Sequence, residues 1–231
     1  MRVLILGATG MVGQGAVREC LRDPAVTAVV TLGRRSSGIR DPKVTDLVAP
    51  DLTDLTPVAR QLTGLDACFY CLGTSSVGMS EADYTRVTYD LTMSVARRLC
   101  DANAGMTFIY VSGTGTDSTG EGRLMWARVK GRTENALLAM PFKAAYMFRP
   151  GVIQPLHGIK SSTKWTRIFY AATGPLLTVL RSAMPRWIIT TEQIGRAMLV
   201  AATKGAPVKR LENRDIADLA RPSVERDPRY S

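Results

Sequence analysis

The sequence predicts one doubly wound α/β domain, built on a parallel sheet, with a small C-terminal capping region. Short apolar, β-branched runs alternate with longer segments of helical periodicity, which is typical of parallel strands joined by crossover helices. The chain has 231 residues, a size that one α/β domain commonly reaches. Hydrophobic residues make up 45% of it and charged residues 22%, the balance of a folded globular protein. We expect a single domain over residues 1–221, with capping elements at about 152–190, and a flexible tail over 222–231.

Six strands are expected, and each is a short apolar run bounded by turn residues. They span residues 2–6, 28–32, 44–48, 67–72, 107–111 and 144–148. Helical periodicity runs between them over residues 11–21, 55–62, 81–100 and 123–138. After Arg149 the alternation gives way to a segment punctuated by glycine and proline. There, Thr190-Thr191-Glu192 indicates the N-terminus of a further helix over 194–202.

The net charge of +10 would suit a polyanionic partner, but the basic residues are scattered and form no run of five or more. The sequence has no zinc-finger spacing, and its 6% of aromatic residues form no interleaved stacking platform, so we expect no nucleic-acid partner. The apolar stretch 168–180 is too short to span a bilayer and is broken by Gly174-Pro175, so we expect no stable membrane insertion. A basic surface that favours phosphorylated ligands is the milder interpretation.

The four cysteines indicate free thiols in a reducing compartment. Cys68 and Cys71 form a C-x-x-C, but within an expected strand residues three apart point to opposite faces and cannot share a metal ion. His157 is the one histidine, so we expect no metal site. It is a general-acid candidate, or more simply a surface-turn residue. Because the chain begins directly with a strand, without a targeting segment, we expect a cytoplasmic location.

The first expected strand runs directly into the glycine-rich turn Gly7-Ala8-Thr9-Gly10-Met11-Val12-Gly13, and a helix follows. Backbone N–H groups at a helix N-terminus can bind a pyrophosphate, and glycines permit its close approach. The alternative is a chance cluster of glycines, which the position directly after a hydrophobic strand disfavours. The turn predicts a nicotinamide dinucleotide site with the cofactor-binding residues Gly7, Thr9, Gly10, Met11, Val12 and Gly13.

The end of the second expected strand bears on the choice of cofactor. An enzyme that selects NAD places an acid there for the ribose 2′-hydroxyl, whereas a 2′-phosphate requires positive charge. The sequence has no acid in this segment and has Arg34 and Arg35 instead. Guanidinium groups match phosphate oxygens, so Arg34, supported by Arg35, predicts NADP(H) in preference to NAD(H). The alternative is that an arginine-rich surface simply places two arginines in a loop.

The spacing of the turn resembles the T-G-x-x-G-x-x-G-like turns of extended and atypical members of the short-chain dehydrogenase/reductase superfamily, with Gly7, Gly10 and Gly13 in matching positions. The branch that it resembles contains Tat-interacting-protein-like oxidoreductases and bacterial NAD-dependent epimerase/dehydratase homologues. Their motifs C-L-G-T, K-G-x-x-E and F-R-P-G recur here at residues 71–74, 130–134 and 148–151. The resemblance covers roughly residues 1–155 and implies a Rossmann sheet that binds NAD(P).

The resemblance also implies cofactor contacts after later strands. In these proteins an acidic residue after the third strand lies near the adenine, backbone after the fourth strand passes beside the cofactor, and the loop after the sixth strand closes over the nicotinamide. Taken alone, the segment after the fourth strand is equally well a plain strand-end turn. The corresponding residues are Asp51 and Leu52, then Leu72, Gly73 and Thr74, and finally Pro150, Gly151 and Val152.

The segment Trp126-Ala127-Arg128-Val129-Lys130 aligns with the family's Tyr-x-x-x-Lys catalytic signature except at its first residue. In the family the tyrosine exchanges a proton with the substrate, the lysine lowers its pKa and binds the nicotinamide ribose, and a serine or threonine positions the carbonyl. Trp126 cannot exchange the proton, because an indole N–H is only a donor. The catalytic candidates are Lys130, Ser112 and Thr114. The two hydroxyls serve equally well in turn hydrogen bonding, and which one faces a substrate stays open.

Two functions follow from this resemblance. The first is an NADP(H)-dependent oxidoreductase or epimerase acting on an unknown small carbonyl or sugar-like substrate, with proton transfer reassigned to water, Thr114 or another tyrosine. The second is a catalytically weak or silent NADPH-binding regulatory protein. A third interpretation, peripheral membrane association through the basic and apolar C-terminal third, needs no cofactor. The helices at 81–100 and 123–138 correspond to the dimer face of many relatives, so we expect a monomer or a homodimer.

Overall fold

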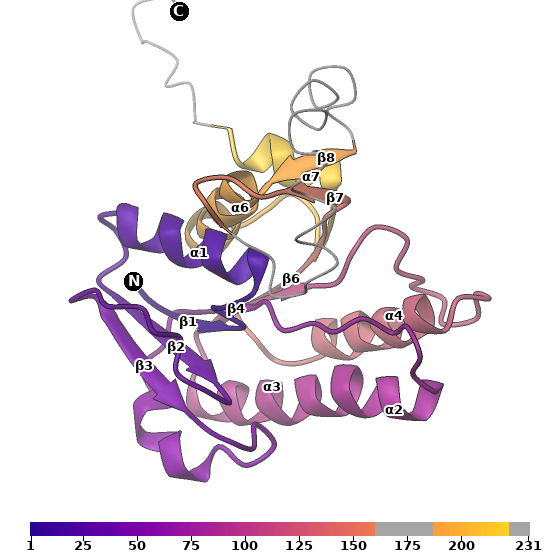
Figure 1. Ribbon diagram of the computed structural model, residues 1–231, viewed down its shortest axis with the longest axis horizontal. Helices are drawn as coiled ribbons and strands as arrows, with labels where there is room; N and C mark the ends of the chain where they lie inside the picture. Colours follow the sequence, from indigo (N-terminus) through magenta and orange to yellow (C-terminus); the bar gives the residue numbers. More distant parts are fainter. Residues whose placement is uncertain (160–186, 222–231) are drawn as a thin grey trace, which may run out of the picture.

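The computed structural model describes residues 1–159 and 187–221, and its main feature is a parallel sheet in the order β3-β2-β1-β4-β5-β6-β9 (Figure 1). Every neighbouring pair of strands in it is parallel. The strands are β1 (Arg2–Leu6), β2 (Ala28–Gly33), β3 (Val44–Val48), β4 (Ala67–Tyr70), β5 (Thr107–Val111), β6 (Ala144–Arg149) and β9 (Arg210–Glu212). Strand order reverses between β1 and β4, which is where sheets of this kind bind ligands. The predicted doubly wound fold class is confirmed.

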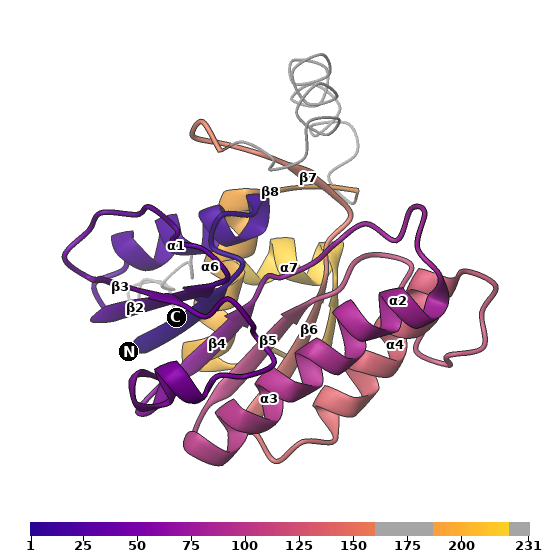
Figure 2. The same cartoon turned by 60° about the horizontal axis from the view of Figure 1, so that its bottom comes forward.

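Helices cover both faces of the sheet (Figures 1 and 2). One face carries α1 (Met11–Arg22), α6 (Thr191–Lys204) and α7 (Asn213–Leu219). The other carries α2 (Glu81–Thr85), the π-helical turn η2 (Arg86–Asp90), α3 (Leu91–Ala102) and α4 (Met125–Leu138). Because successive side chains of a strand point to opposite faces, Val3 and Ile5 pack with α1 and α6, whereas Leu4 and Leu6 pack with α3. The central strands β1 and β4 are therefore apolar on both faces, as buried parallel strands usually are, whereas β3 carries Asp46.

The expected elements are present, with differences at their ends. The strands at 2–6, 44–48 and 107–111 have the predicted bounds, and the others differ by one or two residues at the C-terminal end. The predicted helix at 55–62 is the 3₁₀-helix η1 (Thr56–Leu62), with a proline in its first turn. The N-terminus expected at Thr190-Thr191-Glu192 is present: Thr190 and Gln193 form a capping box, and the helix runs from Thr191 to Lys204, two residues beyond the expected end at 202.

The sequence did not predict the three-residue strands β7 (Val152–Gln154) and β8 (Ile188–Thr190), nor β9 and α7. The first two strands form a small parallel sheet of their own. Three residues are too few to show an alternating pattern, which is why these strands escaped the sequence analysis.

Helices α1 and α6 cross at very short range behind the glycine turn. A β-carbon on Gly15 would lie 2.6 Å from the Thr191 carbonyl oxygen, and one on Gly195 would lie 2.8 Å from the Gly15 carbonyl oxygen. Glycine is therefore required on both helices. The crossing therefore fixes α1 against α6, a helix far along the chain. The first turn of α1 follows β1, where the strand order reverses.

Several expectations fall outside the described residues. They are the apolar stretch 168–180, most of the capping region, and the tail 222–231. Within residues 1–159 and 187–221, no helix has the length and apolar character needed to cross a bilayer. The same residues contain no cluster of three or more histidine, cysteine or acidic side chains that could hold a metal ion. Cys68 and Cys71 point into opposite faces of the sheet, as predicted.

Candidate functional site

The glycine turn joins β1 to α1 where the strand order reverses. Gly7 has a φ of +79°, and a β-carbon there would lie 2.8 Å from the Cys71 carbonyl carbon. A β-carbon on Gly13 would lie 2.1 Å from the Gly7 carbonyl oxygen. Gly10 is the N-cap of α1, and because it has no side chain, no side-chain oxygen caps the first turn of this helix. The turn is therefore compact, and the first N–H groups of α1 have no side-chain cap, an arrangement suited to an anionic ligand.

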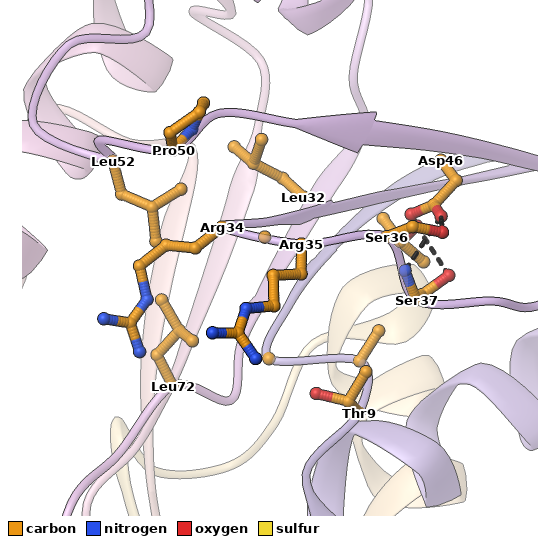
Figure 3. Close-up of a pocket in the computed structure, with 14 residues that line it drawn as sticks. Thr9, Leu32, Arg34, Arg35, Ser36, Ser37, Asp46, Pro50, Leu52 and Leu72 are labelled. Carbon is orange, nitrogen blue, oxygen red and sulfur yellow. Dashed lines mark hydrogen bonds between the residues drawn. The ribbon is translucent and has the colours of Figure 1, made fainter.

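A cavity of about 750 Å³ opens beside this turn (Figure 3). It lies between the glycine turn, the loop after β2, and the residues that follow β3 and β4. Its size is that of a small-molecule or cofactor site. It is lined by Gly7, Ala8, Thr9, Thr31, Leu32, Gly33, Arg34, Arg35, Ser36, Ser37, Asp46, Pro50, Leu52 and Leu72.

Arg34 and Arg35 line the cavity and are exposed. Both side chains extend from the loop after β2 toward the part of the cavity bounded by Thr9 and Leu72 (Figure 3). Within the described part of the chain, neither guanidinium takes part in an ion pair or a side-chain hydrogen bond. Two uncompensated cations thus face a cavity beside a helix N-terminus, which makes this region attractive to a phosphorylated ligand.

The structure adds an acid to the cavity that the sequence analysis missed. Asp46 lies on β3 opposite Thr31. Its carboxylate accepts hydrogen bonds from Thr31 Oγ1 at 2.5 Å, from Ser36 Oγ at 2.6 Å and from the Ser37 N–H at 2.8 Å. Burial raises the pKa of Asp46, but the hydrogen bonds from Ser36, Thr31 and Ser37 outweigh it and leave the pKa below its ordinary value. Asp46 is therefore an anion at neutral pH.

The other predicted cofactor residues are placed less uniformly. Leu52 and Leu72 line the cavity, whereas Asp51 is exposed, and its carboxylate accepts hydrogen bonds from Thr53 N at 2.8 Å and Thr53 Oγ1 at 2.7 Å. Those bonds are local to the turn and lower the pKa of Asp51. The cavity lining does not include Gly10, Met11, Val12, Gly13, Asp51, Gly73, Thr74, Lys130, Pro150, Gly151 or Val152.

The catalytic candidates lie in a second region, at the ends of β5 and β6 beside α4. Ser112 is buried, and its hydroxyl donates to Glu134 Oε1 at 2.5 Å. Thr114 is exposed, and its hydroxyl donates to the Arg149 carbonyl oxygen at 3.0 Å. The Lys130 ammonium donates to the Ser112 carbonyl oxygen, and burial lowers the pKa of Lys130 to about 8, although Glu134 raises it. The structure thus brings Ser112 and Lys130 together and leaves Thr114 at the surface.

The motifs K-G-x-x-E and F-R-P-G meet through a buried ion pair that the sequence did not predict. Glu134 is fully buried, and both its oxygens accept hydrogen bonds from Arg149, with Arg149 Nε lying 3.0 Å from Oε1. The same guanidinium donates to Ser118 Oγ at 2.6 Å and to Glu212 Oε1 at 3.0 Å. The paired geometry compensates for the burial of both charges.

Trp126 occupies the first position of the signature on α4, four residues before Lys130. Its ring lies over Gly115, where a β-carbon would be 3.5 Å from the ring. The nearby phenols of Tyr84 and Tyr110 are poor substitutes for the missing tyrosine, because both are almost fully buried and burial raises the pKa of each.

The loop after β6 is fixed from both sides. The Pro150 carbonyl oxygen accepts the Thr114 N–H at 3.0 Å, and the Gly151 N–H donates to Asn213 Oδ1 at 2.8 Å. Val152 begins β7 and is exposed. His157 lies in the turn beyond, with Nε2 2.6 Å from Glu192 Oε2. This carboxylate is a partner that the sequence spacing did not reveal.

Comparison with known proteins places this geometry in a family. Residues 7–144 match the family described as NAD(P)H-binding. The chain belongs to the NAD(P)H-binding family. The match begins at Gly7, directly after β1, and ends at Ala144, the first residue of β6, so it includes the cavity lining and Lys130.

Three curated relatives are similar over much of the chain. It is 28% identical to "Protein fmp52, mitochondrial" of Emericella nidulans, covering 87% of each chain. It is 22% identical to "Protein FMP52, mitochondrial" of Meyerozyma guilliermondii, covering 100% of this chain and 99% of that one. It is 28% identical to "Protein HTATIP2" of Rattus norvegicus, covering 65% of this chain and 62% of that one. The predicted resemblance to the Tat-interacting-protein-like branch of the short-chain dehydrogenase/reductases is confirmed.

Solved structures agree on the fold. The crystal structure of gox2253 matches with a TM-score of 0.67 at 17% identity, covering 91% of this chain and 68% of that one. The Bordetella bronchiseptica enzyme WbmF, in complex with NAD⁺, matches with a TM-score of 0.62 at 15% identity, covering 95% of this chain and 76% of that one.

The predicted cytoplasmic location is wrong, because both Fmp52 relatives are named as mitochondrial proteins. The prediction rested on a chain that opens directly with a strand. That strand is β1, which the sheet needs between β2 and β4, and its position carries no information on the compartment.

Proposed function

We propose that this protein binds a nicotinamide dinucleotide in the cavity beside the glycine turn and prefers NADP(H) to NAD(H). The observation that carries the preference is the pair Arg34 and Arg35, exposed on the cavity lining without an ion pair among the described residues. In sheets of this type the loop after β2 reaches the 2′ position of the adenine ribose. Guanidinium groups there favour a 2′-phosphate, which carries about two negative charges, over a hydroxyl.

We further propose that the chemistry, where there is turnover, is that of an oxidoreductase or epimerase on a small carbonyl or sugar-like substrate. The bound nicotinamide would supply hydride transfer. Lys130 is the proposed ligand for the cofactor ribose, and Thr114 the proposed ligand for the substrate oxygen, because the Ser112 hydroxyl is buried against Glu134. The cofactor-binding segments Leu72–Thr74 and Pro150–Val152 keep the roles that the family resemblance implies.

A regulatory role is the second candidate, and Trp126 is the observation that favours it. The indole has no acid–base cycle near neutral pH, and the phenols of Tyr84 and Tyr110 are buried. A protein with an intact nucleotide cavity and no proton donor can report NADPH occupancy without turnover.

Binding is tested by titrating the protein with NADPH and NADH while following energy transfer from tryptophan. We expect tighter binding of NADPH, and we expect Arg34→Glu to weaken it by about 10–100-fold while leaving NADH little changed. Arg40→Glu is the matched control, since it makes the same charge change at an exposed residue outside the cavity lining. Absence of binding for both nucleotides, or an equal loss in the control, would contradict the proposal.

The two candidate functions are separated by turnover. A panel of aldehydes, ketones and quinones is offered with NADPH, and the rate is compared with that of Lys130→Ala protein. A rate above the variant supports the enzyme. Equal rates, together with an NADPH-dependent change in association state, support the regulator.

A further inference from the structure

Asp46 accepts hydrogen bonds from the loop that carries the two arginines. We call residues 33–39 the selector loop, because it contains Arg34 and Arg35. Two groups of this loop donate to the Asp46 carboxylate: Ser36 Oγ at 2.6 Å and the Ser37 N–H at 2.8 Å. A third bond, from Thr31 Oγ1 at 2.5 Å, fixes the carboxylate itself to β2.

The same two serines carry the constraint further along the loop. The Gly38 N–H donates to Ser36 Oγ at 3.1 Å, and the Ile39 N–H donates to Ser37 Oγ at 3.3 Å. The start of the loop is held separately, since the Gly33 carbonyl oxygen accepts the Ala49 N–H at 3.0 Å. The selector loop is thus fixed at both ends. In its second half, Thr31 Oγ1 also lies 3.4 Å from Ser37 Oγ and Ile39 packs against the core, but the shortest hydrogen bonds are those to Asp46.

An acid beside two arginines would ordinarily pair with them. Here the two guanidinium groups and Asp46 line the same cavity, yet no ion pair joins them. The carboxylate oxygens already accept three hydrogen bonds, and Figure 3 shows Asp46 turned toward Ser36 and Ser37, away from the two arginines. The serines therefore keep the acid from neutralising the cations.

We propose that Asp46 is a positioning residue for NADP(H) selectivity: it orders the selector loop so that Arg34 and Arg35 face the 2′-phosphate unpaired. This rests on the proposed function. The opposing interpretation is that Asp46 acts directly on the cofactor, as a ribose-hydroxyl ligand that repels a 2′-phosphate. The two interpretations predict opposite signs for the same substitution.

The experiment measures the Kd of NADPH and of NADH for wild type and for Asp46→Ala. We expect the substitution to weaken NADPH binding by about tenfold, because the arginines lose their ordered loop, with NADH changed much less. Asp46→Asn keeps one carbonyl oxygen and is expected to retain part of the selectivity. Asp54→Ala is the matched control, an exposed acid outside the lining that holds the Thr56 N–H at 2.9 Å.

A selectivity for NADPH that is unchanged or increased in Asp46→Ala would overturn the inference. If Asp46→Ala does not fold, Ser36→Ala and Thr31→Val take its place, since each removes one bond to the carboxylate and leaves the acid. Both variants are expected to reduce the preference for NADPH by less than Asp46→Ala does. A preference equal to that of wild type in both variants would also overturn the inference. If wild type binds neither nucleotide, or binds both alike, the proposed function fails instead.

Discussion

The two ends of the functional edge of the sheet treat charge in opposite ways. Beside β2, Arg34 and Arg35 are exposed and have no acidic partner among the described residues. Beside β6, Arg149 and Glu134 are buried and bind one another through two hydrogen bonds. The first region leaves two positive charges without an acidic partner among the described residues, whereas the charges of the second neutralise one another.

This difference separates the residues that can bind a phosphate from those that stabilise the fold. A cation held in solvent contributes little to folding but can bind an incoming phosphate strongly. A buried charge is tolerable only while its partner is present, so removing that partner leaves a large desolvation penalty. Substitutions at Glu134, Lys130 and Arg34 test this contrast, in order of decreasing effect on stability.

The largest effect is expected from Glu134→Ala, which leaves Arg149 buried without its main partner and frees the Ser112 hydroxyl. The free energy of unfolding should fall by about 3–5 kcal/mol, the usual consequence of breaking a buried pair. Chemical denaturation measures it. Asp218→Ala is the control, because it removes the exposed pairs with Arg214 and Arg221 and should cost at most about 1 kcal/mol. Similar losses in both variants would remove the contrast.

Lys130 should show an intermediate effect that depends on pH. Burial lowers its pKa from 10.5 to about 8 in the folded protein. Below pH 8 both states hold the proton, and the folded state bears the full desolvation penalty. Between pH 8 and 10.5 the unfolded state holds a proton that the folded state releases, so stability rises with pH.

Lys130→Met should abolish that rise, which is worth about 1–3 kcal/mol, and the variant should therefore gain most relative to wild type below pH 8. Urea denaturation between pH 7 and 10.5 measures it. Lys143→Met, at an exposed lysine, should keep the wild-type dependence. A parallel dependence in Lys130→Met and wild type would contradict the assigned pKa.

The sequence was sufficient for the layout of the sheet and for the glycine turn, because both are local. A strand such as β1 is one uninterrupted apolar run, and the turn follows it directly. The short strands β7 to β9 have too few residues to show a period. Only their pairing with residues far along the chain defines them.

The site was predictable where a single residue type decides its chemistry, and not where two distant residues must meet. Arg34 could be read from the loop itself. Asp46 looked like an ordinary polar residue in a strand, and it needs the register that sets it opposite Thr31. Glu134 and Arg149 both lay in recognised motifs, but their pairing depends on α4 packing against β6, which no spacing encodes.

The smallest effect on stability is expected at Arg34, the exposed arginine that is compared with the buried Arg149. Arg34→Ala removes an exposed cation with no partner among the described residues, so the free energy of unfolding should change by less than about 0.5 kcal/mol. Wild type and Arg34→Ala should therefore be almost equally stable without ligand, and NADPH should make them differ. NADPH at 100 times its Kd should stabilise wild type by about 2.7 kcal/mol, and the variant by much less at the same concentration, because only a bound ligand favours the folded state. Thermal unfolding with and without NADPH measures both quantities, and an Arg34→Ala protein that is strongly destabilised without ligand would show that this cation serves the fold rather than the nucleotide.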